Sequence, residues 1–238
     1  MMSAAFAELG LDWRYLRLPV PPARFAETVR ALPGSGFAGA NVTIPHKLAA
    51  YELASELTPA ARAIGAANTL TFGDGGAISA DNTDAGGLLD AIGEPLFGRA
   101  ALVLGAGGAG RAAVWALREE GADVAVWNRT PERAQALAAE LGVRLAAGPL
   151  SVDLLVNATS VGLHGEDPEA ELPLEDAGLV VDLVYTDRPS RLLAWAEQGG
   201  ARTVDGLAVL VRQGARSFER WTGQAAPIAA MDAAARSV

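Results

Sequence analysis

From residue 100 onward, short apolar runs alternate with longer segments in which apolar residues recur at helical spacing. The apolar runs predict strands buried on both faces, and they lie near Ala101, Asp123, Leu154, Val180 and Thr203. The segments between them predict helices that begin at Gly107, Pro131 and Pro189. Because strands and helices alternate, this part of the chain is predicted to form a doubly wound parallel sheet of the α/β class.

The first 92 residues carry a less regular pattern of shorter elements. Alternating polar and apolar positions predict strands over 12–18, 39–44, 67–72 and 77–80, and the glycine-rich residues 73–76 join the last two as a hairpin. Helical spacing predicts helices over 4–9, 25–32, 45–56, 59–64 and 85–92, with two more over 207–221 and 227–235. A linker containing Gly93, Pro95 and Gly98 separates the two patterns.

The composition narrows the class of protein. Of the 238 residues, 50% are hydrophobic and 20% are charged, which is typical of a globular protein. The net charge of −9 argues against nucleic acids and anionic membranes as partners, because both require a basic surface. The chain has no cysteine, which excludes disulfides and thiolate chemistry, and no metal site is predicted. We see no signal peptide and no apolar stretch near ~20 residues, so a cytoplasmic location is expected.

A glycine-rich turn joins the first strand of the parallel sheet to its helix. Gly105, Gly107 and Gly110 have the G-x-G-x-x-G spacing, with Gly108 as an additional glycine. In a dinucleotide site the first glycine permits a tight turn, the second lets a pyrophosphate approach the backbone, and the third lets helix and strand pack closely. The free N–H groups at the helix start attract phosphate. The stretch therefore predicts a nucleotide site.

The end of the next strand indicates which nicotinamide cofactor is bound. An NAD site carries an acidic residue there, whereas this chain has Asn128, Arg129 and Thr130, with Arg133 one helical turn later. Guanidinium groups attract the 2′-phosphate of NADP, so NADP is favoured over NAD. The alternative is that Thr130 only caps a helix that starts at Pro131 and that the arginines are solvated.

Three polar clusters interrupt the apolar first third of the chain, over residues 41–47, 65–69 and 81–84. Taken singly, each cluster has a simpler interpretation, with Lys47 as a surface lysine, Asn68 as a turn residue and Asp84 as part of a helix cap. Taken together they indicate a site, because a ketone reduced by hydride needs a proton donor for the developing alkoxide. A Lys/Asp pair can supply that proton, and Asn and Thr can bind a polyol.

These clusters, together with the motifs at residues 105–110, 128–130, 157–160 and 182–185 and with Gly206 and Gln213, resemble the shikimate dehydrogenase family over nearly the whole chain. The resemblance implies NADP-linked interconversion of shikimate and 3-dehydroshikimate, a step towards the aromatic amino acids. It implies a Rossmann domain over 85–206 inserted into a smaller α/β catalytic domain formed by 1–84 and 207–238. It also implies small-molecule partners only, in a monomer or homodimer.

Roles for individual residues follow from the resemblance. Lys47 and Asp84 would be the catalytic pair, with Lys47 donating the proton during ketone reduction and Asp84 orienting it. The substrate would be bound by Thr43, Asn68, Tyr185 and Gln213. The cofactor would be bound by Gly105, Ala106, Gly107, Gly108, Ala109, Gly110, Asn128, Arg129, Thr130, Arg133, Asn157, Ala158, Thr159, Ser160, Leu183 and Gly206. The two histidines, His46 and His164, are expected to be structural or solvent-facing.

The chain departs from the family pattern at its start. Relatives begin with a strand and a His-Ser-x-Ser-Pro segment whose serines bind the substrate carboxylate, and neither is present here. We therefore expect that Met1 is not the natural start, and that without this segment shikimate binding is weakened while NADP binding is retained. Two alternatives stay open: a relative that also or instead oxidises quinate, and a catalytically weak NADP-binding protein.

Overall fold

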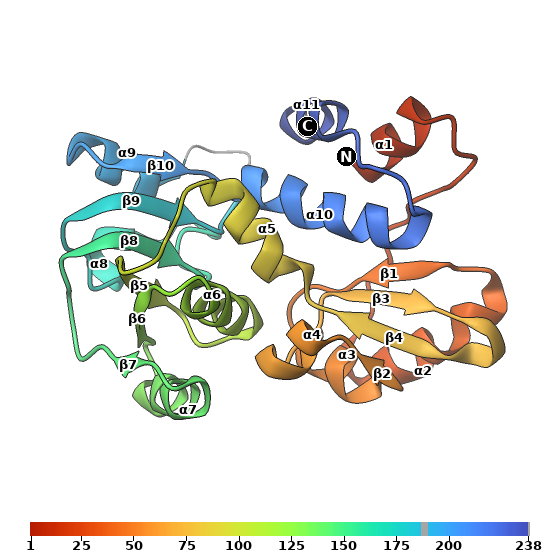
Figure 1. Cartoon of the computed structure of the whole chain (residues 1–238), viewed down its shortest axis with the longest axis horizontal. Coiled ribbons are helices and arrows are strands. Elements are labelled where there is room, and N and C mark those ends of the chain that lie inside the picture. Colours follow the sequence, from red (N-terminus) through yellow and green to blue (C-terminus); the bar gives the residue numbers. More distant parts are fainter. Residues whose placement is uncertain (187–189, 238) are drawn as a thin grey trace. The chain divides into compact units, whose positions relative to one another are not determined.

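The computed structural model describes residues 1–186 and 190–237, and the chain divides into two compact units (Figure 1). Met1–Gly87 and Val211–Val238 form the first unit, and Leu88–Leu210 form the second. Two helices pass from one unit to the other, α5 (Thr83–Ile92) and α10 (Gly206–Thr222). The boundaries expected from the sequence, after residue 84 and before residue 207, fall within these same two helices.

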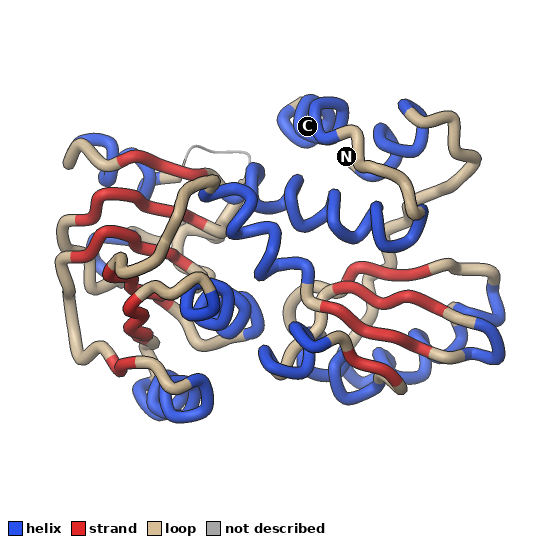
Figure 2. Tube along the Cα trace, in the orientation of Figure 1, coloured by secondary structure: helices blue, strands red, loops and turns tan. Residues whose placement is uncertain are grey.

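The second unit is built on a six-stranded parallel sheet, drawn in red in Figure 2. Its strand order is β10-β9-β8-β5-β6-β7, and every neighbouring pair is parallel. The strands are β5 (Ala100–Leu104), β6 (Asp123–Trp127), β7 (Arg144–Leu145), β8 (Val152–Asn157), β9 (Ala177–Asp182) and β10 (Arg202–Val204). The predicted doubly wound sheet is confirmed, and only the two-residue β7 lacked a sequence signal.

Helices cover both faces of this sheet because successive side chains of a strand point in opposite directions. Val103 packs with α6 (Gly108–Glu119) and α7 (Pro131–Leu141), whereas Leu102 and Leu104 pack on the other side with α9 (Arg191–Gln198). The start predicted at Pro189 lies outside the described residues, but Ser190 caps α9 by accepting a hydrogen bond from the Leu193 N–H at 3.2 Å. A short helix that we did not predict, α8 (Pro168–Glu171), precedes β9.

The first unit contains a four-stranded sheet with the order β1-β3-β4-β2. Its strands are β1 (Gly39–Asn41), β2 (Glu56–Leu57), β3 (Thr69–Phe72) and β4 (Ile78–Asp81), and the predicted β3–β4 hairpin is confirmed. One face of this sheet is apolar, through Leu70, Ile78 and Ala80, and packs against α2 (Phe25–Ala31) and the neighbouring α3 (Lys47–Leu53). A further helix, α4 (Pro59–Ile64), is followed by Gly65 in the left-handed conformation.

Three helices form a separate apolar cluster in this unit. Figure 1 shows α1 (Met2–Glu8) beside α11 (Ile228–Arg236), near both chain ends. Phe6 of α1 and Phe218 of α10 lie with ring centroids 5.5 Å apart, and Met231 of α11 is fully buried beside them. Short 3₁₀ turns occur at Pro22–Arg24, Pro33–Ser35 and Asp74–Gly76. Among the described residues, we find no helix with the length and apolar content needed to cross a bilayer.

Two predictions about the first unit were wrong. Residues 12–18 alternate like a strand but form none, because among the described residues β1 ends the sheet and no strand lies beside them. A segment without a backbone partner cannot form a ladder, whatever its side-chain pattern. The helix predicted over 45–56 ends at Leu53, and Glu56 and Leu57 instead pair in parallel with β4.

Candidate active site

A row of polar residues crosses the sheet of the first unit on the face opposite its apolar side. Asn41 of β1 lies beside Thr69 of β3, which lies beside Asp81 of β4. Helix α10 places Ser217 and Arg220 on this row: the Ser217 hydroxyl is 2.8 Å from Asn41 Nδ2, and Arg220 Nη1 is 3.2 Å from Asp81 Oδ2. Helix α10 is therefore joined to the sheet through polar contacts.

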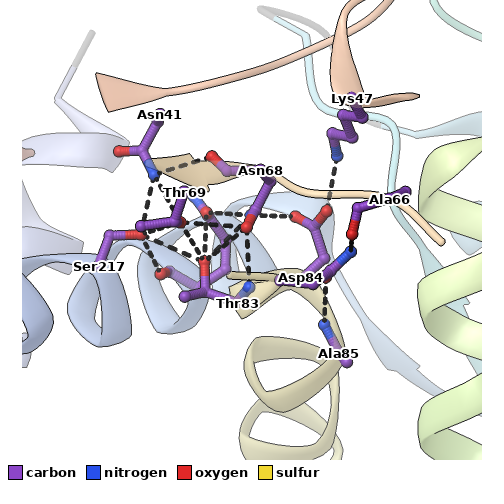
Figure 3. Close-up of polar contacts among 11 residues, drawn as sticks. Asn41, Lys47, Ala66, Asn68, Thr69, Thr83, Asp84, Ala85 and Ser217 are labelled. Atoms are coloured by element: carbon purple, nitrogen blue, oxygen red, sulfur yellow. Dashed lines mark hydrogen bonds and ion pairs between the residues drawn. The ribbon is translucent and has the colours of Figure 1, made fainter. Parts of the chain in front are cut away.

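Lys47 and Asp84 form a close ion pair at one end of this row. Lys47 is the first residue of α3 and Asp84 lies in the first turn of α5, and Lys47 Nζ is 2.7 Å from Asp84 Oδ2. The side chains are only 12% and 20% exposed, so solvent screens this pair less than a surface pair. Figure 3 shows the lysine and the aspartate pointing toward each other.

Asn68 joins this ion pair to the polar row. Its Oδ1 accepts a hydrogen bond from the Thr83 backbone N–H at 2.8 Å, and this contact fixes which end of the amide is the oxygen. Its Nδ2 therefore faces Asp84 and donates to Asp84 Oδ1 at 2.8 Å. The carboxylate thus has a donor on each oxygen, Asn68 on one and Lys47 on the other. Two donors hold an ionised carboxylate in a fixed orientation.

Gln213 reaches this site because two helices approach closely. Its Oε1 lies 3.1 Å from Asn68 Nδ2. A Cβ placed on Gly87 of α5 would lie 2.6 Å from the Gln213 backbone N, so only glycine permits this separation of α5 and α10. Nothing in the local sequence pattern indicated this requirement.

The other residues expected near the substrate lie elsewhere. Thr43 is exposed in the loop between β1 and α3. Tyr185 belongs to the second unit, where it is 48% exposed. His46 is structural, because its ring stacks on Phe25 with centroids 4.6 Å apart and Nε2 lies 2.9 Å from the Val20 carbonyl oxygen. His164 is exposed.

In the second unit, the glycine-rich turn has the shape of a phosphate cradle. A Cβ on Gly110 would lie 2.0 Å from the Gly105 carbonyl oxygen, so the turn closes only with glycine there. A Cβ on Gly107 would meet no atom within 4 Å, which leaves open space at the start of α6. No side chain among the described residues caps this helix. Backbone N–H groups facing open space fit the pyrophosphate of a dinucleotide.

The loop after β6 fits a phosphate on the adenosine ribose. Asn128 Oδ1 accepts from the Ala106 N–H at 3.1 Å, and its Nδ2 donates to the Thr130 carbonyl oxygen at 2.9 Å, which ties this loop to the glycine turn. The Arg129 side chain is 80% exposed, and Arg133 is also exposed. Arg129 Nη1 lies 3.8 Å from Glu171 Oε2, and no acidic residue directly follows the strand. Two accessible guanidinium groups fit the 2′-phosphate of NADP.

Asp182, at the end of β9, organises the neighbouring strand ends. One of its oxygens accepts from Asn157 Nδ2 at 2.8 Å and from the Val184 N–H at 3.1 Å, and the other accepts from the Ser190 hydroxyl at 2.5 Å. Burial raises the pKa of this carboxyl above its usual range, although the hydrogen bonds from Ser190, Val184 and Asn157 oppose the shift. Asp182 is thus a buried acid that is held by three donors.

Asn157 connects Asp182 to residues 157–160, the loop that was expected to contact the cofactor. Its Oδ1 accepts from the Thr159 N–H at 3.1 Å and from the Thr159 hydroxyl at 2.7 Å. The end of β9 borders a cavity of about 840 Å³, whose lining includes Asp182, Tyr185 and Gly206. The residues expected to bind nicotinamide therefore lie at adjoining strand ends of one unit.

Sequence reasoning missed several residues that build these sites. Asn41 and Asp182 lie inside motifs that the sequence displays, but neither was singled out. A charged residue at the end of a buried apolar strand was the available signal for Asp182. The sequence signal for Ser217 was weaker: it lies four residues after Gln213 and therefore on the same helix face. The requirement for glycine at position 87 had none.

The fold and both sites define the class of protein: a two-unit α/β oxidoreductase that combines a dinucleotide-binding sheet with a buried Lys/Asp pair. Three family models match the chain. They are the shikimate dehydrogenase substrate binding domain over residues 1–70, shikimate / quinate 5-dehydrogenase over 88–158, and the shikimate 5'-dehydrogenase C-terminal domain over 206–236.

Known proteins agree with this assignment. The chain is 48% identical to the shikimate dehydrogenase (NADP(+)) of Methylobacterium radiotolerans, over 90% of this chain and 82% of the relative. It is 46% identical to that of Thermus thermophilus, over 99% and 91%. A crystal structure of shikimate 5-dehydrogenase from Thermus thermophilus in complex with NADP(H) and shikimate superposes with a TM-score of 0.90, at 42% identity and 99% and 92% coverage. The chain belongs to the shikimate dehydrogenase family, as predicted.

Proposed function

We propose that this protein is an NADP-dependent shikimate dehydrogenase, which reduces 3-dehydroshikimate to shikimate and runs reversibly. The observation that carries the proposal is the Lys47–Asp84 pair, which is largely buried and is held on its second oxygen by Asn68. A cation next to a fixed carboxylate can give up and recover a proton at one position, as a carbonyl reduction requires.

Lys47 donates a proton from Nζ to the alkoxide oxygen that develops when the ketone is reduced, and it takes the proton back in the oxidation. Asp84 orients Lys47 through the 2.7 Å contact. Asn68, Gln213 and Thr43 bind substrate hydroxyls with amide and hydroxyl groups, which can both donate and accept. We also assign Tyr185, which belongs to the second unit, a contact with the substrate in the complex that contains cofactor.

The cofactor is held by the second unit. NADP, when bound, supplies or accepts the hydride. The glycine turn 105–110 binds the pyrophosphate through backbone N–H groups, and Arg129, Thr130 and Arg133 bind the 2′-phosphate. Asn128 keeps these two segments together. Residues 157–160, Leu183 and Gly206 contact the ribose and nicotinamide.

We also propose that the protein works in the cytoplasm on small molecules, as a monomer or homodimer. Sedimentation with and without NADP would measure the oligomeric state. A mass that corresponds to a trimer or a larger assembly would contradict this part of the proposal.

The direct test is spectrophotometric. Reduction of NADP⁺ and NAD⁺ is followed by the absorbance of the reduced nicotinamide, with shikimate and with quinate as substrates. We expect shikimate with NADP⁺ to give the highest kcat/KM. The family model over residues 88–158 covers both shikimate and quinate enzymes, so a higher kcat/KM with quinate would replace shikimate as the assigned substrate.

Substitution of Lys47 separates an enzyme from a protein that only binds NADP. Lys47→Ala should abolish turnover and leave NADP affinity unchanged, because Lys47 and the glycine turn belong to different units. A wild-type protein that binds NADP but turns over neither polyol would favour the binding protein. Full activity in Lys47→Ala would remove Lys47 from the mechanism.

A further inference from the structure

Behind the Lys47–Asp84 pair lies a cluster of buried hydroxyl groups that the proposed reaction does not use directly. Thr69, Thr83 and Ser217 come from β3, α5 and α10, and all three are at least 96% buried. The Thr69 Oγ1 lies 2.8 Å from Ser217 Oγ and 3.1 Å from Thr83 Oγ1. Figure 3 shows these hydroxyls close to one another, next to Asn41 and Asn68.

Hydrogen bonds connect Asn41 to Asn68 through the hydroxyls of this cluster. Asn41 Nδ2 can only donate, and it lies 2.8 Å from Ser217 Oγ and 3.2 Å from Thr69 Oγ1. Both hydroxyl oxygens therefore act as acceptors towards Asn41. The Ser217 hydroxyl lies 2.8 Å from Thr69 Oγ1 and 3.2 Å from the Gln213 carbonyl oxygen, and it can donate to either. The Thr69 hydroxyl donates to Asn68 Oδ1 at 3.1 Å, and the Thr83 hydroxyl donates to the same oxygen at 3.2 Å.

The direction matters because Asn68 has one accepting end and one donating end. With its oxygen accepting from the Thr69 hydroxyl, its Nδ2 faces Asp84, and it also lies 3.0 Å from Thr83 Oγ1. An amide rotated by half a turn would place its oxygen against the Asp84 carboxylate and its NH₂ against the Thr83 backbone N–H. Two repulsive contacts would then replace two hydrogen bonds in a buried site, where unpaired groups are costly.

We propose that Asn41 and Ser217 are positioning residues for the proposed reaction, holding the Asn68 amide in the orientation that donates to Asp84. Neither side chain touches Lys47 or Asp84 through a described contact, so each acts through Asn68. The inference rests on the roles proposed above for Lys47, Asp84 and Asn68.

The first test is Ser217→Ala, which removes the hydroxyl and keeps a good helix former on α10. We expect kcat/KM for shikimate to fall about tenfold, the equivalent of one buried hydrogen bond, with most of the loss in kcat. NADP affinity should stay unchanged, because the residues proposed to bind it lie in the second unit. A kcat/KM within about twofold of the wild-type value, the range of measurement between neutral variants, would overturn the proposal.

Two threonines of strand β3 give a matched control. Thr69→Val removes a hydroxyl of the network, whereas Thr71→Val removes a hydroxyl that is buried and has no hydrogen-bond partner among the described residues. Both substitutions preserve shape and lie two residues apart on one strand. Thr69→Val should lower kcat/KM as Ser217→Ala does, and Thr71→Val should not. Equal losses in the two variants would show that only packing is being measured.

A double substitution tests whether Ser217 acts through Asn68. In an Asn68→Ala background, Ser217→Ala should produce no further loss of kcat, because the group that it positions is already absent. A full additional tenfold loss would mean that Ser217 acts independently of Asn68, and it would overturn the proposal.

A readout without turnover separates this inference from the proposed function. The side-chain NH₂ resonances of Asn68, observed by ¹⁵N NMR, should shift in Ser217→Ala and in Asn41→Asp and stay in place in Thr71→Val. Unchanged resonances in the first two variants would overturn the positioning role, whatever the substrate. If the resonances shift in the first two variants but the wild-type protein turns over no shikimate, the proposed function alone is rejected.

Discussion

The two candidate sites are each organised by one buried polar side chain, and the two side chains differ in charge. In the first unit it is the Asn68 amide, which donates from one end and accepts at the other. In the second unit it is the Asp182 carboxyl, which accepts on both oxygens. An amide fixes a direction and stays neutral, whereas a carboxylate draws several donors together but carries a desolvation cost.

The difference corresponds to the work expected at each place. The first site must keep a charged pair, Lys47 and Asp84, in one alignment, and a second buried carboxylate beside it would compete with Asp84 for the lysine. The second site must hold the ends of β8 and β9 in place beside open space, and a single acceptor of three hydrogen bonds does this. The second site also depends on the backbone itself, through the close contact between Gly105 and Gly110.

The largest effect is expected where backbone alone builds the site. Gly110→Ala places a methyl group 2.0 Å from the Gly105 carbonyl oxygen, and neither backbone can move without breaking the strand–turn–helix connection. We expect a loss of about 3 kcal/mol in the free energy of unfolding, the upper range for overpacking. Urea unfolding followed by tryptophan fluorescence measures it.

Gly107→Ala is the control for this substitution, because its added methyl group meets no atom within 4 Å. Its stability should stay within about 0.5 kcal/mol of the wild-type value. NADP affinity should fall, since the methyl group occupies the space proposed for the pyrophosphate. Equal destabilisation by the two variants would contradict the close-contact interpretation.

The second largest effect is expected when the amide that organises the first site is replaced by a carboxyl, as in the second site. Asn68→Asp keeps the shape of the side chain but places a carboxylate oxygen 2.8 Å from Asp84 Oδ1, where a donor was. One of the two acids must then take up a proton. We expect kcat to fall about 100-fold or more, the loss typical of a misaligned catalytic group, with NADP affinity unchanged. Steady-state kinetics above pH 7 measure this loss. A kcat near the wild-type value would contradict the interpretation.

The reciprocal substitution gives the second site the neutrality of the first. Asp182→Asn leaves one accepting oxygen for three donors, so either Ser190 or the pair of N–H groups from Asn157 and Val184 loses its partner. We expect NADP affinity to weaken about tenfold, as for loss of one or two buried hydrogen bonds. Fluorescence titration with NADPH measures this, and shikimate binding to the first unit serves as the control that should not change.

The smallest effect is a slope of stability with pH. Burial raises the pKa of Asp182 in the folded protein, so between the ordinary carboxyl pKa and the raised value the folded state binds more protons than the unfolded state. Asp182 therefore stabilises the folded state. This stabilisation is fully present below the ordinary pKa and is lost as the pH rises through the raised pKa. Unfolding experiments across this range should show the slope in the wild-type protein and a flatter profile in Asp182→Asn.

Much of the architecture was readable because it depends on local spacing. Apolar runs located the five principal strands of the parallel sheet, and the glycine spacing located the nucleotide turn at 105–110. Both follow from residues that are neighbours in sequence, where backbone geometry dictates which side chains share a face. The polar clusters at residues 41–47, 65–69 and 81–84 indicated a site, and the resemblance to a family added the roles of Lys47, Asp84 and Asn68.

The sequence by itself determined these elements, the absence of an acidic residue after β6 and the residue types available for chemistry. Only the tertiary structure decided which distant residues meet: Asn41 and Ser217 are 176 positions apart, and Asn68 and Gln213 are 145 apart. It also decided that residues 12–18 form no strand, since pairing requires a neighbour. Spacing along a chain specifies faces, but partners across the fold are chosen by packing, and that choice places Gln213 beside Asn68 and Ser217 behind it.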